Sequence, residues 1–335
     1  MNYREIFTDT FKLIWREKKL VVIGLFGSLI LALAFVIYFA GAMQGQMSLI
    51  AITAGANGEM IDEKAGEALW KSVLVYVASL GVAGLLGLIG YVVNLIARAG
   101  IVAEGERAWR GEKVDVGRGM RRGKRKVAVY FTLDMLWVLP AILLFAFVGV
   151  MGNVFLFKMI DGGSSGQVLG SPDADFGFLA GVFVILGALF CLSLLYALGR
   201  GLFAPLMYQA SVIDDLSVID AVGAGWRLAR THLGSMLIFL MIIRAVQLGM
   251  VVILQVLNVF FLFVFMGPWI ATMASLQNGV SEAAPAVNGA FIAVAALGIG
   301  GVSWLFLSIS EVIYLIYYVR IYRELVSQGQ STAPS

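Results

Sequence analysis

Six apolar stretches, each long enough to cross a lipid bilayer, set the architecture of this 335-residue chain. A membrane-spanning helix needs about 20 mostly apolar residues. The stretches occupy residues 20–43, 72–96, 127–155, 178–207, 236–265 and 290–319. Only 13% of the residues are charged, whereas soluble domains carry about 25%. The sequence therefore predicts an all-α polytopic membrane helical bundle of six transmembrane helices.

The distribution of basic residues predicts the orientation of these spans. Of the 24 Lys and Arg residues, Lys64, Lys71 and Lys158 follow odd-numbered spans and Arg244 lies inside a span. All the others lie on the side that holds the N-terminus. Because basic residues concentrate in cytoplasmic segments, we expect a multi-pass protein of the cell (cytoplasmic) membrane with both termini cytoplasmic. The first apolar stretch is longer than a signal-peptide core, which favours a retained anchor.

Recurring sequence features predict a threefold internal repeat. A short basic segment precedes each odd-numbered span, at residues 11–20, 120–126 and 226–233. Each even-numbered span ends with an aromatic residue that leads to an arginine, at Arg98, Arg200 and Arg320. We expect three parallel hairpin repeats, approximately 1–100, 101–203 and 204–326, in a single integral membrane domain (1–326). A flexible tail (327–335) would follow.

Each repeat is expected to begin with a cytoplasmic amphipathic helix. Apolar residues recur at steps of three or four through the first and third basic segments and the residues just before them, as in helices that lie in the membrane interface. In the first segment they are Tyr3, Phe7, Phe11 and Ile14, with Trp15 beside them. In the third they are Ile219, Val222, Trp226, Ala229 and Leu233.

The second basic segment is less amphipathic and far more basic. Runs of bases next to a span are typical of binding to anionic lipid headgroups, although the same bases can serve only to set topology. Nucleic-acid binding is disfavoured, because no stacking platform or DNA-reading motif accompanies the bases. The candidate headgroup-binding residues are Arg118, Arg121, Arg122, Lys124, Arg125, Lys126, Arg227 and Arg230.

Three ionisable residues fall well inside the spans: Asp134, Arg244 and Glu311. At 1.5 Å per residue they would lie about 12, 18 and 14 Å from the inner interface, so all three could meet there, with Asn94 and Gln247 nearby. Charges at such depth usually face the bundle interior and pair with one another. Three hypotheses follow: a structural ion pair that fixes how the hairpins pack, a proton or substrate site in a polar cavity, or partial exposure without pairing. Because one arginine faces two acids, either one acid is protonated or Arg200 joins the group.

Closely spaced glycines in the second span predict tight helix packing. Gly81, Gly84, Gly87 and Gly90 recur every three residues, and small residues let membrane helices approach closely. We expect this row to face another helix of the same chain. The outer segments 44–67, 158–175 and 268–289 are expected to be solvated loops without a calcium-binding motif.

Catalytic and metal-binding chemistry is missing from the pattern. The chain has one cysteine, Cys191, and one histidine, His232, whereas zinc and iron–sulfur sites need clusters of such ligands. No phosphate-binding loop, nucleophile elbow or dinucleotide fingerprint is present. We therefore expect no metal, no cofactor and no enzymatic activity.

Four segments carry a resemblance to a known family. They are residues 98–103 (RAGIVA), 111–117 (GEKVDVG), 211–228 and 317–322 (YYVRIY). Together they resemble the poorly characterised six-span bacterial membrane proteins related to the membrane domain of glycerophosphodiester phosphodiesterases. The resemblance implies a six-span fold over most of the chain and no agreed activity. It transfers no catalytic residue.

These observations favour a non-enzymatic membrane-organising or accessory subunit that contacts anionic lipid and a partner membrane protein. The alternative is a secondary transporter or channel that uses Asp134, Arg244 and Glu311. A lipid-modifying enzyme at the inner interface is a weaker alternative, because the sequence offers no identifiable nucleophile.

Overall fold

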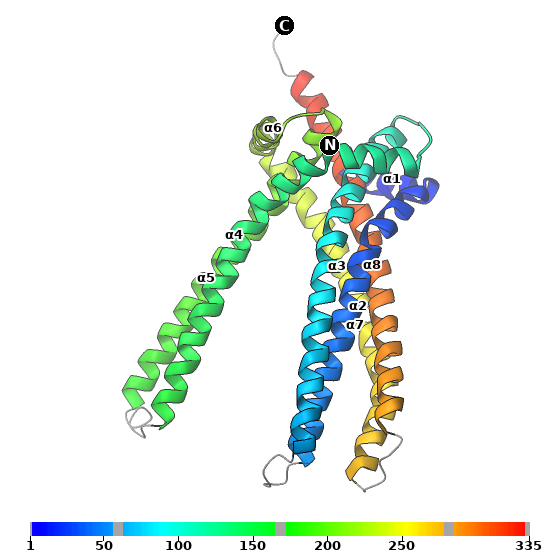
Figure 1. The fold of residues 1–335 in the computed structure, drawn as a ribbon. Coiled ribbons are helices and arrows are strands. Elements are labelled where there is room, and N and C mark those ends of the chain that lie inside the picture. The colour runs from blue at the N-terminus through cyan, green and yellow to red at the C-terminus, as the bar shows by residue number, and fades with distance from the viewer. Residues whose placement is uncertain (1, 56–62, 165–171, 278–283, 332–335) are drawn as a thin grey trace. The chain divides into compact units, whose positions relative to one another are not determined.

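A computed structural model describes residues 2–55, 63–164, 172–277 and 284–331, and within these ranges the chain is helical with no strand (Figure 1). The helices are α1 (Tyr3–Arg16), α2 (Lys19–Gly55), α3 (Glu63–Trp109), α4 (Val116–Ser164), α5 (Pro172–Ile213), α6 (Val218–Thr231), α7 (Leu233–Gln277) and α8 (Ala284–Ser331). Six of them, all but α1 and α6, are long and apolar enough to cross a membrane. The all-α class and the six predicted spans are confirmed.

The helices extend well beyond the apolar stretches. α2 continues to Gly55, and α3 begins at Glu63. Most of each predicted outer loop is therefore helical, and only residues 56–62, 165–171 and 278–283 of those loops lie outside the described residues. α8 likewise runs to Ser331, so the predicted tail is helical over residues 327–331, while residues 332–335 lie outside the described part. A helix satisfies its own backbone hydrogen bonds, so it does not need to end where hydropathy falls.

Side-chain caps delimit the two short helices. The side chain of Asn2 accepts a hydrogen bond from the Glu5 amide at the start of α1. Ser217 does the same for the Asp220 amide at the start of α6. Such caps satisfy amides that have no partner within the helix. The second basic segment differs, because residues 118–126 form the first turns of α4 and continue into the span without a break.

Contacts divide the chain into two compact units. Unit 1 comprises Met1–Val127 and Met241–Glu324, and unit 2 comprises Ala128–Leu240 and Leu325–Ser335. The boundaries fall inside α4, α7 and α8. The single domain and its three repeats remain a sequence prediction.

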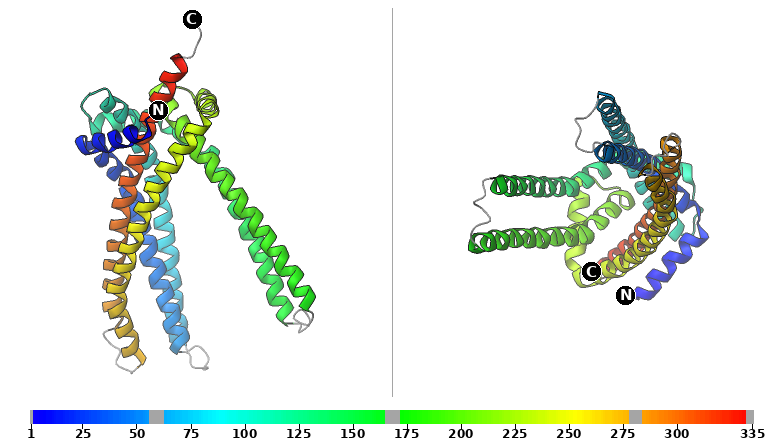
Figure 2. Two further views of the ribbon diagram at one scale, coloured as in Figure 1. Left: turned by 180° about the vertical axis from the view of Figure 1, so that it is seen from behind. Right: turned by 90° about the horizontal axis from the view of Figure 1, so that it is seen from below.

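Unit 1 is held together by close helix crossings at small residues. α2 and α3 lie side by side over much of their length (Figure 2). A Cβ atom added to Gly27 of α2 would lie 2.2 Å from the Cβ of Ala97 on α3. One added to Gly24 would lie 2.5 Å from a methyl carbon of Val312 on α8. Inside lipid the hydrophobic effect does not drive helices together, so close packing of this kind is what favours helix association.

The glycine row of α3 packs at one position only. A Cβ on Gly90 would lie 2.8 Å from the Leu31 amide nitrogen, whereas a Cβ on Gly81, Gly84 or Gly87 would have no atom of another described element within 4 Å. The expectation that the whole row packs within the chain is wrong. A step of three residues turns about 60° short of a full circle, so Gly81 and Gly90 lie on opposite sides of the helix.

In unit 2, aromatic pairs join α4 to α5, and α6 packs through small residues. The rings of Tyr130 and Tyr208 are 4.9 Å apart, and those of Trp137 and Tyr196 are 6.1 Å apart. These pairs join α4 to α5. α6 packs its small residues Ala221, Gly225 and Ala229 inward. A Cβ on Gly225 would lie 2.9 Å from the backbone nitrogen of Met207.

The crossing of α3 and α4 in unit 1 gives a stability prediction. A Cβ on Gly123 would lie 1.9 Å from the carbonyl oxygen of Ile96, so Gly123→Ala must move one backbone away from the other. We expect it to destabilise the protein by about 1–3 kcal/mol. Thermal unfolding in detergent measures the effect.

Gly84→Ala is the matched control, because Gly84 is an exposed helical glycine with no neighbour within 4 Å. Alanine there should leave stability unchanged or raise it by up to about 1 kcal/mol through helix propensity. Equal melting temperatures for the two variants would contradict the close crossing.

Candidate functional site

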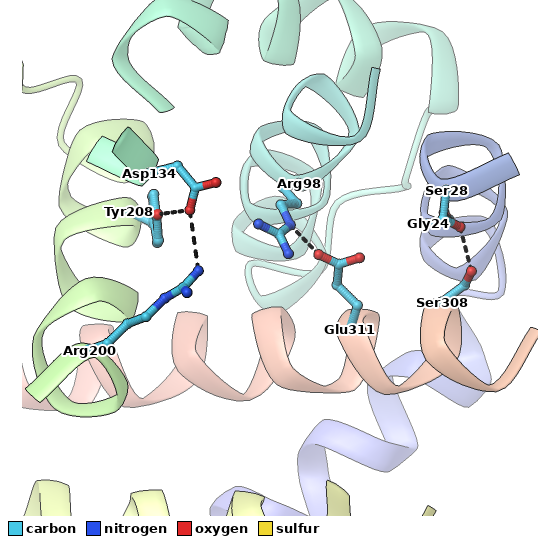
Figure 3. A network of polar contacts seen from close by, with 8 residues as sticks. All are labelled: Gly24, Ser28, Arg98, Asp134, Arg200, Tyr208, Ser308 and Glu311. Atoms are coloured by element: carbon cyan, nitrogen blue, oxygen red, sulfur yellow. Dashed lines mark hydrogen bonds and ion pairs between the residues drawn. The ribbon is translucent and has the colours of Figure 1, made fainter. Parts of the chain in front are cut away.

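An ion pair between α3 and α8 lies in unit 1 (Figure 3). The Nε of Arg98 donates to Oε1 of Glu311. Both side chains are partly shielded, with 30% of the arginine and 19% of the glutamate exposed. The pair therefore neutralises the carboxylate that the sequence places inside the sixth span.

A group of polar contacts between α2 and α8 lies in the same unit. The indole Nε1 of Trp304 donates to the hydroxyl of Ser28 over 2.9 Å. Ser28 also bonds to the hydroxyl of Ser308 (Figure 3). One of these two hydroxyls donates to the other, and the accepting one can donate to the helix carbonyl one turn before it, that of Gly24 for Ser28 or of Trp304 for Ser308. These groups satisfy one another, as polar groups buried between helices must.

The second intramembrane carboxylate belongs to unit 2. Asp134 on α4 is 2% exposed. Its Oδ1 accepts a hydrogen bond of 2.8 Å from the hydroxyl of Tyr208 and lies 3.5 Å from Nη2 of Arg200 (Figure 3). Tyr208 and Arg200 both come from α5. The aspartate thus joins the two helices of one hairpin through a donor and a positive charge.

The predicted intramembrane residues therefore have other partners than the sequence suggested. Glu311 pairs with Arg98, and Asp134 pairs with Arg200. Arg244 is exposed on α7 and donates to Gln247, three residues further on, over 3.0 Å. The fifth candidate, Asn94, is half-buried on α3; its Oδ1 lies 3.6 Å from where a Cβ on Gly27 would be.

Sequence reasoning missed Arg98 and Tyr208 as partners, and considered Arg200 only as a residue that could join the two acids. The two arginines were already visible as the residues that close the even-numbered spans. They were assigned to the interface, although a long arginine side chain can extend its charged group several ångströms along the helix from its backbone position. The length of the arginine side chain is therefore the sequence feature that could have predicted these two ion pairs. The hydroxyl of Tyr208 had no such signal, because its position depends on the packing of α4 against α5.

One end of unit 1 carries most of its charged side chains. This basic end comprises α1, the connection from α3 to α4, the first turns of α4 and the last turns of α8 up to Glu324. Glu104 is fully buried there and accepts two hydrogen bonds from the guanidinium of Arg118, at 2.8 and 2.7 Å. Glu106 accepts from Arg110 at 2.8 Å and lies 3.3 Å from Nε of Arg323. Through these ion pairs, the end of α3 holds the connection from α3 to α4, the first turn of α4 and the end of α8 together.

Arg118 is consequently an internal partner, although the sequence placed it among the headgroup-binding residues. Four other candidates make no ion pair with any described residue: Arg121, Arg122, Lys124 and Arg125. Arg122 is half-buried and the other three are exposed. Lys126 is half-buried. We refer to Arg121, Arg122, Lys124 and Arg125 as the unpaired bases.

The two candidates on α6 belong to unit 2. Arg227 and Arg230 are exposed and lie beside Trp226, which is 50% exposed. Trp226 stacks on Phe203 of α5 with ring centroids 4.4 Å apart. The buried face of α6 therefore consists of small residues, and a large part of its predicted apolar stripe faces outward.

Asp115 precedes α4 and caps its first turn. Its Oδ1 accepts a hydrogen bond of 2.8 Å from the Arg118 amide. This hydrogen bond, followed by the positive charge of Arg118, lowers the pKa of the Asp115 carboxyl. A lowered pKa means that the cap stabilises the fold above the ordinary aspartate range and is lost as pH falls below it.

Within the described ranges, no group of three or more His, Cys, Asp or Glu residues is arranged to hold a metal ion. Cys191 is exposed on α5. No family model, curated protein or solved structure matches the chain. The relation to the membrane domain of glycerophosphodiester phosphodiesterases therefore stays a prediction from the segments quoted above.

The pair between Arg98 and Glu311 is open to a double-mutant test. Glu311→Gln leaves the arginine charge beside a neutral amide, which we expect to cost about 1–3 kcal/mol, less than in a fully buried pair. Arg98→Gln should cost a similar amount. The double variant should lose less than the sum of the two, because neighbouring charges couple.

Arg244→Gln is the control for removing one positive charge from a span, since Arg244 is exposed and its hydrogen bond to Gln247 stays within one helix turn. Thermal unfolding of the four variants in one detergent gives the comparison. Strictly additive losses for Arg98 and Glu311 would show that the two groups do not interact.

Proposed function

We propose that this protein is a non-enzymatic multi-pass membrane protein that binds anionic lipid headgroups with its basic end. In this proposal it acts as an accessory or membrane-organising subunit in the cell membrane, with the basic end on the cytoplasmic side. The unpaired bases carry the proposal. The acids at this end pair with Arg118, Arg110 and Arg323. Arg121, Arg122, Lys124 and Arg125 form no ion pair with any described residue, and of these four Arg121 has its charge near the Asp115 carboxyl.

The two short helices support a position at the membrane interface. Trp15 of α1 is 79% exposed and Ile219 of α6 is 83% exposed. Both helices also carry exposed bases, such as Lys12 and Arg227. Large apolar residues next to bases are typical of helices that lie between acyl chains and headgroups.

One face of α3 supports contact with a partner helix. Leu85 is 62% exposed and Leu88 is 69% exposed, and a Cβ added to the nearby Gly84 or Gly87 would meet no described residue of another helix within 4 Å. Small residues on an uncovered apolar helix suit close approach by a second membrane helix.

A secondary transporter or channel is the second candidate, because Asp134 and Glu311 are ionisable groups within spans. We favour it less, since each carboxylate already faces an arginine. If it is correct, Asp134→Asn with Glu311→Gln should abolish ion or substrate flux in proteoliposomes while the protein remains folded.

Lipid selectivity tests the first proposal. We would replace all four unpaired bases with glutamine and reconstitute the full chain in nanodiscs of phosphatidylglycerol and phosphatidylcholine. Each base near a membrane surface contributes about 1 kcal/mol to binding of anionic lipid. Enrichment of phosphatidylglycerol around the protein, measured by mass spectrometry of lipids retained on partial delipidation, should therefore fall severalfold.

Arg121→Lys, Arg122→Lys and Arg125→Lys together form the matched control, because they keep every charge. This variant should retain the enrichment. An unchanged lipid ratio in the glutamine variant would refute the proposal, and an equal loss in both variants would show that charge is not what selects the lipid.

A further inference from the structure

A cavity of about 300 Å³ lies at the basic end of unit 1, between α1 and the end of α3. Its volume is at the lower limit for small-molecule sites and suits a polar headgroup. Both charged and apolar side chains line it. The lining residues are Asp9, Lys12, Leu13 and Arg16 of α1 with Ala108, Trp109 and Gly111.

The turn that ends α3 forms one wall of this cavity. The amide of Glu112 donates to the carbonyl of Arg107, and the amide of Gly111 donates to that of Ala108, over 3.0 and 3.1 Å. Gly111 has φ +82°, which glycine adopts without strain. Trp109 is fixed by the guanidinium of Arg320, 5.2 Å from its ring centre. These contacts connect the wall to the end of α3 and to α8.

The opposite wall supplies cationic donors. Nζ of Lys12 is 3.8 Å from the Asp9 carboxylate, which is too far for a hydrogen bond, so all three ammonium hydrogens are available. Arg16 donates to the carbonyl of Ala108 over 3.3 Å, and its Nε lies 3.7 Å from Glu17. A guanidinium has five N–H donors, so donors of Arg16 remain for a ligand.

The charge of the lining selects the kind of ligand. Among the side chains that line the cavity, Lys12 and Arg16 against Asp9 leave one net positive charge, which matches a phosphodiester monoanion; Glu17, which faces Arg16, is not part of the lining. Ammonium and guanidinium groups are the usual protein ligands of phosphate oxygens. The carboxylate of Asp9 can accept a hydrogen bond from a hydroxyl of the same headgroup.

The neighbours of these bases indicate a ligand from the membrane. Phe11 and Trp15 each precede one of the two bases in sequence and are 39% and 79% exposed. Tryptophan concentrates at the level of the lipid headgroups. An acyl chain that follows these apolar side chains would bring its phosphate to the cavity.

We infer that this cavity binds the phosphodiester headgroup of an anionic, hydroxyl-bearing phospholipid such as phosphatidylglycerol. Lys12 and Arg16 would hold the phosphate, and Asp9 would accept from a headgroup hydroxyl. The inference rests on the proposed function, because it requires the basic end to lie at the lipid interface. It adds a defined site to the diffuse attraction of the unpaired bases.

The test titrates the delipidated full chain in a neutral detergent with short-chain phosphatidylglycerol, phosphatidylcholine or inorganic phosphate. Lys12→Gln should weaken binding of phosphatidylglycerol about fivefold, as expected for one base at a membrane surface. Lys12→Glu should weaken it further. Arg4→Gln is the control, because Arg4 is an exposed base of the same helix that does not line the cavity.

Each outcome has a distinct meaning. A loss in Lys12→Gln with none in Arg4→Gln supports the site. Equal effects of the two variants would overturn the site but leave the proposed function intact, because the unpaired bases would still select anionic lipid. Equal affinity for phosphatidylcholine would overturn the headgroup assignment. Competition by inorganic phosphate at the concentration of the lipid would overturn a lipid ligand.

Discussion

The pairing of carboxylates with arginines is the interaction on which the packed parts of this protein depend. The buried acids of the described chain are Glu104, Glu106 and Asp134, and each lies within 4 Å of an arginine nitrogen. An ionised carboxylate cannot be taken out of water without such compensation. The helices therefore pack where these partners can reach one another.

The same pairing determines what the protein can offer to its surroundings. At the basic end of unit 1, the buried acids form ion pairs with the arginines that hold the connection between α3 and α4 in place. The bases that follow on the next turns of α4 form no ion pair with an acid in the described part of the chain. A membrane protein whose surplus charge lies in one short helical segment beside its span is suited to bind anionic headgroups at that level.

Hydropathy predicts the six spans well, because crossing a bilayer requires length and apolar composition and little else. Other features depend on geometry that hydropathy does not contain. The partner of Asp134 depends on how far Arg200 extends along α5, and Tyr208 is placed by packing. The glycine row of α3 failed as a prediction because three-residue spacing rotates around the helix. The cavity beside α1 depends on the left-handed turn at Gly111, for which a glycine after a helix is only a weak signal.

The most direct test of the account is the lipid composition next to the wild-type protein in nanodiscs of phosphatidylglycerol and phosphatidylcholine, measured at increasing salt concentration. If the basic end binds anionic lipid, phosphatidylglycerol is enriched at low salt and declines toward the bulk ratio as the bases are screened, with a residual fraction held in the cavity. A ratio equal to that of the bulk lipid at every salt concentration would contradict it.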